Sequence, residues 1–245
     1  MKNCTCRITI FSYTNIVKLK IQSKNSFSGS IVIGMEEKLR RTVIGLTGPS
    51  GAGKGMVGKI FEENGIPCID TDLVYRKLLI PPSECLDELC GYFGNGITDD
   101  NGTLDHRKLA KVVFGKGNEK KLAVLNSISH RHILNKVRET IKEYNNTGFS
   151  VVAVDAPLLF ESGFDSECDL IVSVMAPYNE RLSRIILRDG ISEDAAKMRL
   201  SAQHGDEYYT ERSDYIINND CDTERLMLQT LIIIKDILKQ AENKV

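Results

Sequence analysis

A glycine-rich loop between an apolar strand and an amphipathic helix limits the possible folds more than any other feature of this sequence. Thr42–Thr47 is a short, β-branched apolar run, which is typical of a strand buried on both faces of a parallel sheet. It leads into Gly-Pro-Ser-Gly-Ala-Gly-Lys at 48–54 and then into apolar residues at helical spacing. Backbone N–H groups of such a loop turn inward around phosphate oxygens, and the helix N-terminus adds partial positive charge. The loop therefore predicts an α/β fold that binds a nucleotide.

The loop supplies the predicted nucleotide-binding residues. Lys54 is expected to reach the β- and γ-phosphates of ATP. Around it, the residues expected to contact the nucleotide are Gly48, Pro49, Ser50, Gly51, Ala52, Gly53, Gly55 and Met56. A glycine-rich turn that only carries a surface lysine is the alternative, and the strand before the loop and the helix after it argue against that alternative.

One position of the loop departs from the usual pattern. The residue after the lysine is commonly Ser or Thr, whose hydroxyl contacts Mg²⁺, but this chain has Gly55 there and Met56 next. Nucleotide binding is expected to tolerate this change better than metal positioning. Several oxygen-bearing side chains remain to hold the ion, directly or through water. They are Ser50, Asp70, Asp72 and Asp155, of which we favour Asp70 and Asp155.

Strands alternate with helices along the rest of the chain. Further strands are predicted at 67–70, 150–155, 170–175 and 215–218, and further helices at 54–64, 179–188, 192–203 and 223–240. Between the second and third strands, 71–145 has no convincing strand and is interpreted as a helical insertion. Its helices are predicted around 73–80, 83–92, 105–114 and 119–144. This alternation predicts a parallel sheet with right-handed crossovers.

Length and composition favour a single domain. With 245 residues, the chain can form one α/β core with an insertion, which we place within a domain of 35–245. Residues 1–34 contain five basic and no acidic side chains, and they lack the apolar periodicity of a core segment. We expect an extension that is disordered, is a transit peptide, or lies upstream of the true start at Met35.

Charge and cysteine content limit the expected partners and compartment. The formal net charge of −1 gives no overall attraction to nucleic acid or to an anionic membrane, so neither is expected as a partner. The 7 cysteines are odd in number and include no C-x-x-C pair, which favours reduced thiols in the cytoplasm. No run of about 18 apolar residues is present, which argues against a transmembrane helix. The expectation is a cytoplasmic protein, either a monomer, which we favour, or an oligomer.

Acidic residues follow two of the predicted strands. Asp70 ends the second strand and Asp72 follows it, at the edge of the sheet where the phosphate loop is expected. A carboxylate there can accept the proton of an attacking hydroxyl or hold Mg²⁺. The alternative is that Asp72 only caps a helix beginning at Leu73. Asp155 ends the third strand after four apolar residues, a pattern typical of a Walker B strand but weak on its own.

Basic residues form a stripe on one predicted helix. Arg181, Arg184 and Arg188 are spaced so that they share one helix face. Such a face either neutralises phosphate charge or is a solvated basic surface, and the spacing alone leaves both interpretations open.

Together these residues resemble the dephospho-CoA kinase family, in the nucleoside-monophosphate-kinase-like group of P-loop proteins. The resemblance runs from Thr42 to Leu238, and its most specific feature is Pro-Leu-Leu-Phe-Glu at 157–161 after a strand. Other matching residues are Leu46-Thr47-Gly48, Asp70-x-Asp72 with Arg76, Asp105-x-Arg107, Leu125-Asn126, His130, Asp155-Ala156, Arg188-Asp189, Gln203 and Asp214 to Asn218. The family phosphorylates the ribose 3′-hydroxyl of dephospho-CoA with MgATP, the last step of coenzyme A synthesis. The resemblance implies a P-loop NTPase fold with a five-stranded parallel sheet, ordered 2-3-1-4-5 and flanked by helices.

The resemblance also implies roles for individual residues. Asp72 is the general base, Lys54 holds ATP phosphates, Arg188 is a lid arginine within a lid region of about 179–212, and Asn218 lies near the adenine. The helical insertion receives dephospho-CoA. The residues expected to bind this substrate are Asp72, Arg76, His130, Pro157 and Leu158. His130 has a second explanation as a capping or packed residue.

Two other functions stay open at the level of sequence. A kinase of the same fold could act on a nucleoside monophosphate or another small alcohol, and both 157–161 and the helical insertion argue against this. A nucleotide-binding protein without catalysis is suggested only by Gly55.

Overall fold

The computed structural model describes residues 7–13, 16–22, 30–33, 41–115, 117–220 and 222–243. At its centre is a five-stranded sheet in which all neighbouring strands are parallel, in the order β5-β6-β4-β7-β8. The strands are β4 (Thr42–Thr47), β5 (Cys68–Asp70), β6 (Val151–Asp155), β7 (Leu170–Met175) and β8 (Tyr215–Asn218). Numbered along the chain, this order is 2-3-1-4-5, which confirms the predicted fold.

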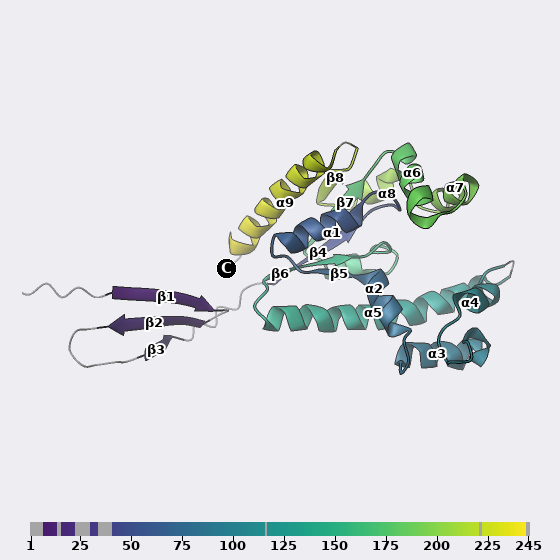
Figure 1. Cartoon of the computed structure of the whole chain (residues 1–245), viewed down its shortest axis with the longest axis horizontal. Coiled ribbons are helices and arrows are strands. Elements are labelled where there is room, and N and C mark those ends of the chain that lie inside the picture. The colour runs from purple at the N-terminus through teal and green to yellow at the C-terminus, as the bar shows by residue number, and fades with distance from the viewer. Residues whose placement is uncertain are drawn as a thin grey trace, which may run out of the picture.

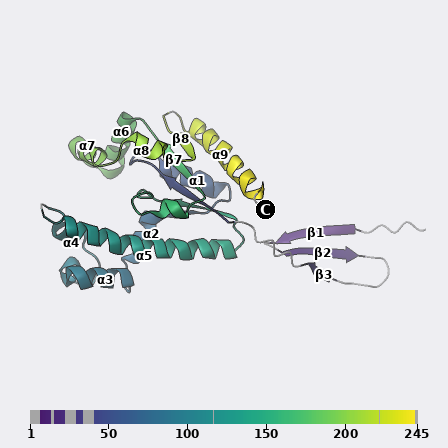
Figure 2. The ribbon, with the colours of Figure 1, turned by 180° about the vertical axis from the view of Figure 1, so that it is seen from behind.

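Helices cover both faces of this sheet. They are α1 (Lys54–Glu63), α2 (Thr71–Leu78), α3 (Glu84–Phe93), α4 (His106–Val113), α5 (Glu119–Asn146), α6 (Tyr178–Asp189), α7 (Glu193–Ser201), α8 (Asp206–Thr210) and α9 (Thr223–Asn243), with short 3-10 helices η1 (Asn95–Ile97) and η2 (Phe164–Glu167). Figures 1 and 2 show α1 and α9 on one side of the sheet and α5 on the other. The fold is therefore a three-layer α/β/α arrangement.

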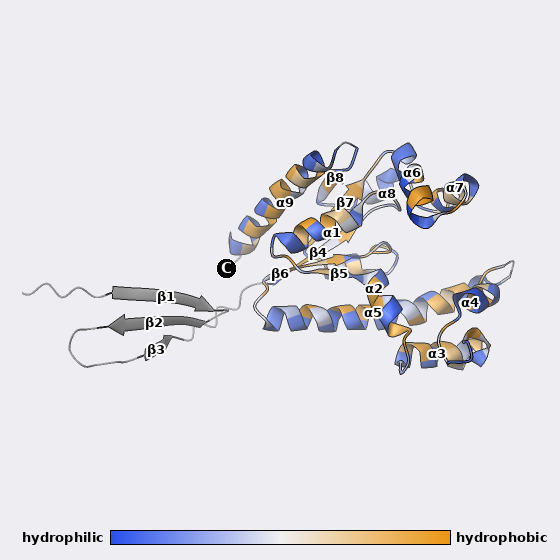
Figure 3. Cartoon of the chain, viewed as in Figure 1, coloured by the Kyte–Doolittle hydropathy of each residue, from blue (hydrophilic) through white to orange (hydrophobic). Residues whose placement is uncertain are grey.

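Continuous apolar sequence explains the central strands. Ile44 and Leu46 of β4 are both 0% exposed, because β4 lies between β6 and β7 with helices on both faces. Along β6, Val151 packs into the core shared with α1 and α9, whereas Val152 packs into the core shared with α5. Figure 3 shows the hydrophobic colour concentrated on these central strands. The strand ends that carry polar residues are thus fixed by a rigid core.

The helical insertion forms an apolar cluster of its own. Helices α2 to α5 occupy the predicted segment, and Leu86, Leu89, Leu109 and Ile128 from three of them are buried together. Because α2 begins directly after β5 and α5 ends shortly before β6, the insertion leaves and rejoins the sheet at neighbouring strands. This places α2 and the first half of α5 beside the carboxyl ends of the strands.

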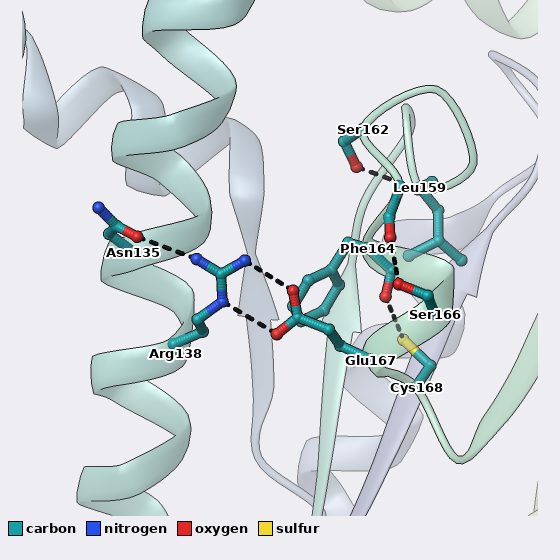
Figure 4. A network of polar contacts seen from close by, with 9 residues as sticks. Asn135, Arg138, Leu159, Ser162, Phe164, Ser166, Glu167 and Cys168 are labelled. Atoms are coloured by element: carbon teal, nitrogen blue, oxygen red, sulfur yellow. Dashed lines mark hydrogen bonds and ion pairs between the residues drawn. The ribbon is translucent and has the colours of Figure 1, made fainter.

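Arg138 ties α5 to the turn that follows β6 (Figure 4). Its Nε and Nη2 donate to the two carboxylate oxygens of Glu167 on η2 at 2.9 and 2.6 Å, and its Nη1 donates to Asn135 at 2.9 Å. The hydrogen bonds from Arg138 lower the pKa of Glu167. Because both side chains are partly exposed, the pair adds only about 1 kcal/mol or less to stability. Its main effect is to hold the segment after β6 against α5.

Two helix positions differ from the prediction. Helix α2 begins at Thr71 and not at Leu73, because the carboxylate of Asp70 accepts a hydrogen bond of 2.9 Å from the Leu73 N–H and caps the helix. The capping explanation for Asp72 was therefore wrong: the neighbouring aspartate is the cap. Helix α8 was not predicted, since five residues give too little periodicity to recognise.

Residues 1–34 contain strands that were not predicted. The strands β1 (Arg7–Tyr13), β2 (Ile16–Gln22) and β3 (Ser30–Ile33) form an antiparallel sheet, which shares no strand with the five-stranded sheet. The β-branched residues in these strands favour extended backbone, although polar residues surround them in the sequence. That residues 1–34 are dispensable stays a prediction.

The described part of the chain shows whether a helix could span a membrane and how its cysteines are paired. No helix there combines the length and apolar character needed to cross a membrane. The thiols of Cys68, Cys85, Cys90 and Cys168 are all free. Burial raises the pKa of Cys68 and of Cys168 to about 12, so both are kept as unreactive thiols at neutral pH.

Candidate active site

A cavity of about 460 Å³ opens at the carboxyl ends of β4, β5 and β6. Its charged side chains come from three parts of the fold. These are the phosphate loop with the start of α1, the ends of β5 and β6 with the start of α2, and helix α6. The lining residues are Ser50, Gly51, Gly53, Lys54, Gly55, Asp70, Asp72, Asp155, Pro157, Arg184, Arg188 and Gln203. The structure thus brings the loop, the three predicted carboxylates and two of the three arginines to one site.

Two glycines of the loop allow its close approach to neighbouring strands. Gly48 has a φ of +135° and Gly53 a φ of +104°, conformations that residues with side chains rarely adopt. A Cβ on Gly48 would clash with the backbone of Val174 in β7, so the loop can pass the neighbouring strand only with glycine here. Glycine at these positions turns the chain sharply into α1, whose N-terminus faces the cavity.

Lys54 is the first residue of α1 and is turned back over the loop. Its Nζ donates a hydrogen bond of 2.8 Å to the carbonyl oxygen of Gly48. Burial lowers the pKa of Lys54, and the nearby carboxylates of Asp155 and Asp72 act in the opposite direction. The ammonium group therefore lies among acids at the centre of the cavity, where it can bind phosphate oxygens.

Asp155 is the most perturbed carboxyl group of the cavity. Burial raises its pKa to about 6, the charges of Asp70 and Asp72 act in the same direction, and Lys54 acts against them. Its Oδ1 is buried and makes no hydrogen bond. A buried acceptor without a donor costs free energy, so this atom is suited to bind a ligand such as a cation or a cation-bound water.

The residues present fit a magnesium ion only together with other oxygens. Among the residues described, no three His, Cys, Asp or Glu side chains converge as a ready metal site. Mg²⁺ usually keeps several waters and takes one or two carboxylates plus phosphate oxygens. The free Oδ1 of Asp155, with Asp70 and Asp72 in the same cavity, meets that requirement. Asp70 is already engaged as the cap of α2, which makes it the weaker of the two predicted ligands.

The arginine stripe of α6 is not a solvated basic face. Arg181 is 7% exposed and pairs with Asp206 of α8 at 3.3 Å. Arg184 donates to the Gly51 carbonyl oxygen at 3.4 Å, and Arg184 and Arg188 both line the cavity. Two of the three side chains thus add positive charge to the site, and the third is buried and paired with α8.

Arg188 is held by its sequence neighbour. Its Nε and Nη2 donate to the carboxylate of Asp189 at 2.8 and 3.0 Å, and Arg199 of α7 pairs with the same carboxylate. These hydrogen bonds, led by those from Arg188, lower the pKa of Asp189 to about 2. The guanidinium therefore stays charged and has a fixed partner at the rim of the cavity.

A second cavity of about 210 Å³ adjoins the first and is mostly apolar. It lies between α2, α5 and the segment after β6, and it shares only Asp72 and Pro157 with the first cavity. Its other lining residues are Thr71, Tyr75, Leu125, Asn126, Ser129, His130, Ile133, Leu134, Ala156, Leu158 and Ser162. Burial lowers the pKa of His130, so this cavity has no permanent positive charge in its lining.

The model of the dephospho-CoA kinase family matches residues 42–225. The chain belongs to the dephospho-CoA kinase family. A dephospho-CoA kinase of Carboxydothermus hydrogenoformans is 38% identical over 193 residues, which cover 79% of this chain and 93% of that protein. One of Listeria monocytogenes is 34% identical over 196 residues, covering 80% and 97%. As a member of this family, the chain is a kinase that phosphorylates dephospho-CoA with ATP in coenzyme A synthesis.

Solved structures agree with this fold. The crystal structure of TT1252 from Thermus thermophilus is 26% identical, with a TM-score of 0.68 over 81% of this chain and 98% of that chain. Dephospho-CoA kinase from Campylobacter jejuni is 24% identical, with a TM-score of 0.60 over 81% and 98%. The second likeness supports the shared fold alone.

Six of the predicted site residues line neither cavity: Gly48, Pro49, Ala52 and Met56 of the loop and its helix, and Arg76 and Asn218 from the resemblance. Arg76, Met56 and Asn218 are all exposed, and the backbone of Asn218 is bonded to Gln229 of α9. Their roles in this dephospho-CoA kinase family member remain predictions. Conversely, Tyr75 and Ser129 of the apolar cavity, whose hydroxyls lie 3.3 Å apart, carry no motif that would have identified them.

Proposed function

We propose that the chain transfers the γ-phosphoryl group of ATP to the ribose 3′-hydroxyl of dephospho-CoA, with Asp72 as the general base. The position of Asp72 carries this proposal, because Asp72 lines both the cavity that contains the phosphate loop and the apolar cavity. The triphosphate belongs in the first, which contains Lys54, Arg184 and Arg188. The neutral ribose of the acceptor, with the adenine attached to it, suits the second. The reacting hydroxyl and the γ-phosphorus then meet beside Asp72.

The proposed step is a single displacement. The acceptor hydroxyl oxygen forms a bond to the γ-phosphorus as the bond to the β,γ-bridging oxygen breaks. The hydroxyl proton passes to the carboxylate of Asp72, and ADP leaves with the electron pair of the broken bond. Lys54 and the loop amides hold the phosphates, while Arg184 and Arg188 stabilise negative charge on the transferred group.

We place Mg²⁺ at Asp155, with Asp70 as the second candidate. The buried Oδ1 of Asp155 has no hydrogen-bond partner, which supports this choice. Bound with the ATP phosphates, Mg²⁺ supplies charge neutralisation on their oxygens. The absent loop hydroxyl at Gly55 is then replaced by water or carboxylate oxygen.

The acceptor is proposed to lie against the segment after β6. Pro157 and Leu158 offer apolar contacts at the mouth of the second cavity, and His130 faces the same cavity from α5. Since the pKa of His130 is lowered, it acts as a neutral hydrogen-bonding group and not as a cation for the acceptor pyrophosphate. Exposed Arg76 on α2 is the proposed contact for that charge. Region 179–212 is proposed as the lid over ATP.

A coupled assay of ADP release tests the function directly. The assay is run with dephospho-CoA, AMP, CMP or no acceptor, in a reducing buffer that matches the cytoplasmic location we propose. We expect release with dephospho-CoA at least about 100 times faster than with either monophosphate or without acceptor. Mass spectrometry should show a product 80 Da heavier that serves as coenzyme A in a second enzyme assay. Faster release with AMP or CMP would reject the proposed acceptor.

A further inference from the structure

We infer that Asn219 is a positioning residue of the phosphate loop. The inference rests on the proposed function, because it concerns how the loop binds ATP. Asn219 directly follows β8 and is 6% exposed. Its Nδ2 donates a hydrogen bond of 2.8 Å to the carbonyl oxygen of Ala52, which lies 167 residues earlier in the chain. Ala52 itself is fully buried at the centre of the loop.

The backbone of Asn219 is fixed from two sides. Its N–H donates to the carbonyl oxygen of Met175 in β7 at 2.7 Å, and its carbonyl oxygen accepts from Arg184 Nη2 at 3.3 Å. Arg184 also donates through Nη1 to the carbonyl oxygen of Gly51 at 3.4 Å. Two consecutive carbonyl groups of the loop, those of Gly51 and Ala52, are therefore held by one connected set of donors.

Holding the Ala52 carbonyl also orients the next N–H group. In a trans peptide the C=O and N–H bonds point in opposite directions, so the N–H of Gly53 points away from Asn219. Gly53 lines the phosphate cavity. Donors held in one direction before ATP arrives bind phosphate oxygens without the entropic cost of ordering the loop. Asn219 thereby fixes the direction of a phosphate-binding donor from outside the loop.

Gly53 makes room for this contact. Its φ is +104°, and a Cβ built on it would clash with Nδ2 of Asn219. A side chain at this position would push Asn219 away from Ala52 as well as strain the backbone. The absence of a side chain at Gly53 therefore leaves the space that Asn219, at the end of β8, needs to reach Ala52.

Two substitutions test the role of Asn219. Asn219→Asp keeps the size of the side chain but places a carboxylate oxygen against the Ala52 carbonyl oxygen. Asn219→Ala removes the donor without adding repulsion. Asn101→Asp is the matched control, because it makes the same chemical change in an exposed turn that lines neither cavity. For each protein we would measure the Kd of a non-hydrolysable ATP analogue by calorimetry, the KM for dephospho-CoA, and the Tm.

The expected result is a selective loss of nucleotide affinity. Asn219→Ala should raise the Kd of the analogue about tenfold and Asn219→Asp about 100-fold, since a buried carbonyl loses its donor in the first case and faces a charge in the second. The KM for dephospho-CoA should stay within about twofold, and the control should match the wild type.

Other results would overturn the inference. A purely structural role predicts a lower Tm with an unchanged Kd in the folded protein. Variants that do not fold at all would also reject the inference, because Asn219 would then serve the fold itself. Failure of the wild type to phosphorylate dephospho-CoA would count against the proposed function and not against this role, since the analogue is measured without acceptor.

Discussion

The hydroxyl of Thr71 donates a hydrogen bond of 3.0 Å to the carbonyl oxygen of Asp155, which joins the first residue of α2 to the last residue of β6. This bond holds the helix that carries Asp72 beside the strand that carries Asp155. Both carboxylates therefore line one cavity, although Asp72 lies at the start of the helical insertion and Asp155 on the strand that follows it. Their different surroundings give them different roles, which separate substitutions can test.

Asp72→Asn should reduce kcat by about 10²- to 10⁴-fold, because the amide cannot accept the proton of the acceptor hydroxyl. ATP binding should stay near normal. The Tm should also change little, since Asp70 and not Asp72 caps α2. Steady-state kinetics, calorimetry and thermal melts check these three quantities. Asp87→Asn on the exposed face of α3 is the control, and near-normal turnover of Asp72→Asn would exclude it as the base.

Gly55→Ser should lower the Mg²⁺ concentration that gives half-maximal rate. The substitution adds a direct oxygen ligand on the first turn of α1, and a Cβ at this position meets no atom within 4 Å. We expect a decrease of roughly threefold to tenfold, measured by titrating Mg²⁺ at saturating ATP. Gly55→Ala provides the control, because it adds the same Cβ without the hydroxyl. Equal midpoints for the serine and alanine variants would mean that the metal is already fully held elsewhere.

Asp155→Asn should change how stability depends on pH in metal-free, nucleotide-free protein. The pKa of this carboxyl is raised from 3.8 to about 6 by burial, so the unfolded chain loses its proton first as the pH rises. Stability is therefore lost between about pH 4 and pH 6 in the wild type, whereas the asparagine variant has no such loss. The free energy of unfolding of the variant minus that of the wild type should rise by about 1–3 kcal/mol from pH 4 to pH 7. Urea unfolding at several pH values measures this difference, and a constant difference would contradict the burial of the charge.

A chain that starts at Met35 should keep its stability and its kinase activity. The strands β1 to β3 form a sheet that shares no strand with the five-stranded sheet, so the site does not depend on them for its framework. Thermal melts and the ADP-release assay, run on the full and shortened chains side by side, check this. A decrease in Tm of many degrees would show that residues 1–34 belong to the folded unit.

Strands buried on both faces could be predicted closely from the sequence. β4 and β7 begin and end at the predicted residues, because a parallel strand between helices needs an unbroken apolar run that stops where the sheet stops. The bounds of β8, a partly exposed edge strand, were also predicted. The start of α2 was harder, since Asp70 and Asp72 are both good caps and only the structure shows which carboxylate reaches the Leu73 N–H.

Contacts between distant segments could not be predicted. Nothing local in the sequence tells that Arg181 is buried against α8, or that Asn219 reaches Ala52 across the sheet. Adjacent Asn218 carries the same side chain but is exposed, and residue type alone does not separate the two. The charged residues of the first cavity could therefore be predicted from sequence motifs. The lining of the apolar cavity could not, because it depends on how α2 and α5 pack.

The shared wall between the two cavities has a kinetic and stereochemical consequence. Because Asp72 and Pro157 border both spaces, donor and acceptor are expected to be bound at the same time, and no enzyme side chain needs to carry the phosphoryl group between them. A ternary complex of this kind gives intersecting double-reciprocal plots, not the parallel lines of a ping-pong mechanism. With a chiral thiophosphoryl donor, one in-line displacement would invert the configuration at phosphorus, whereas transfer by way of an enzyme-bound intermediate would retain it.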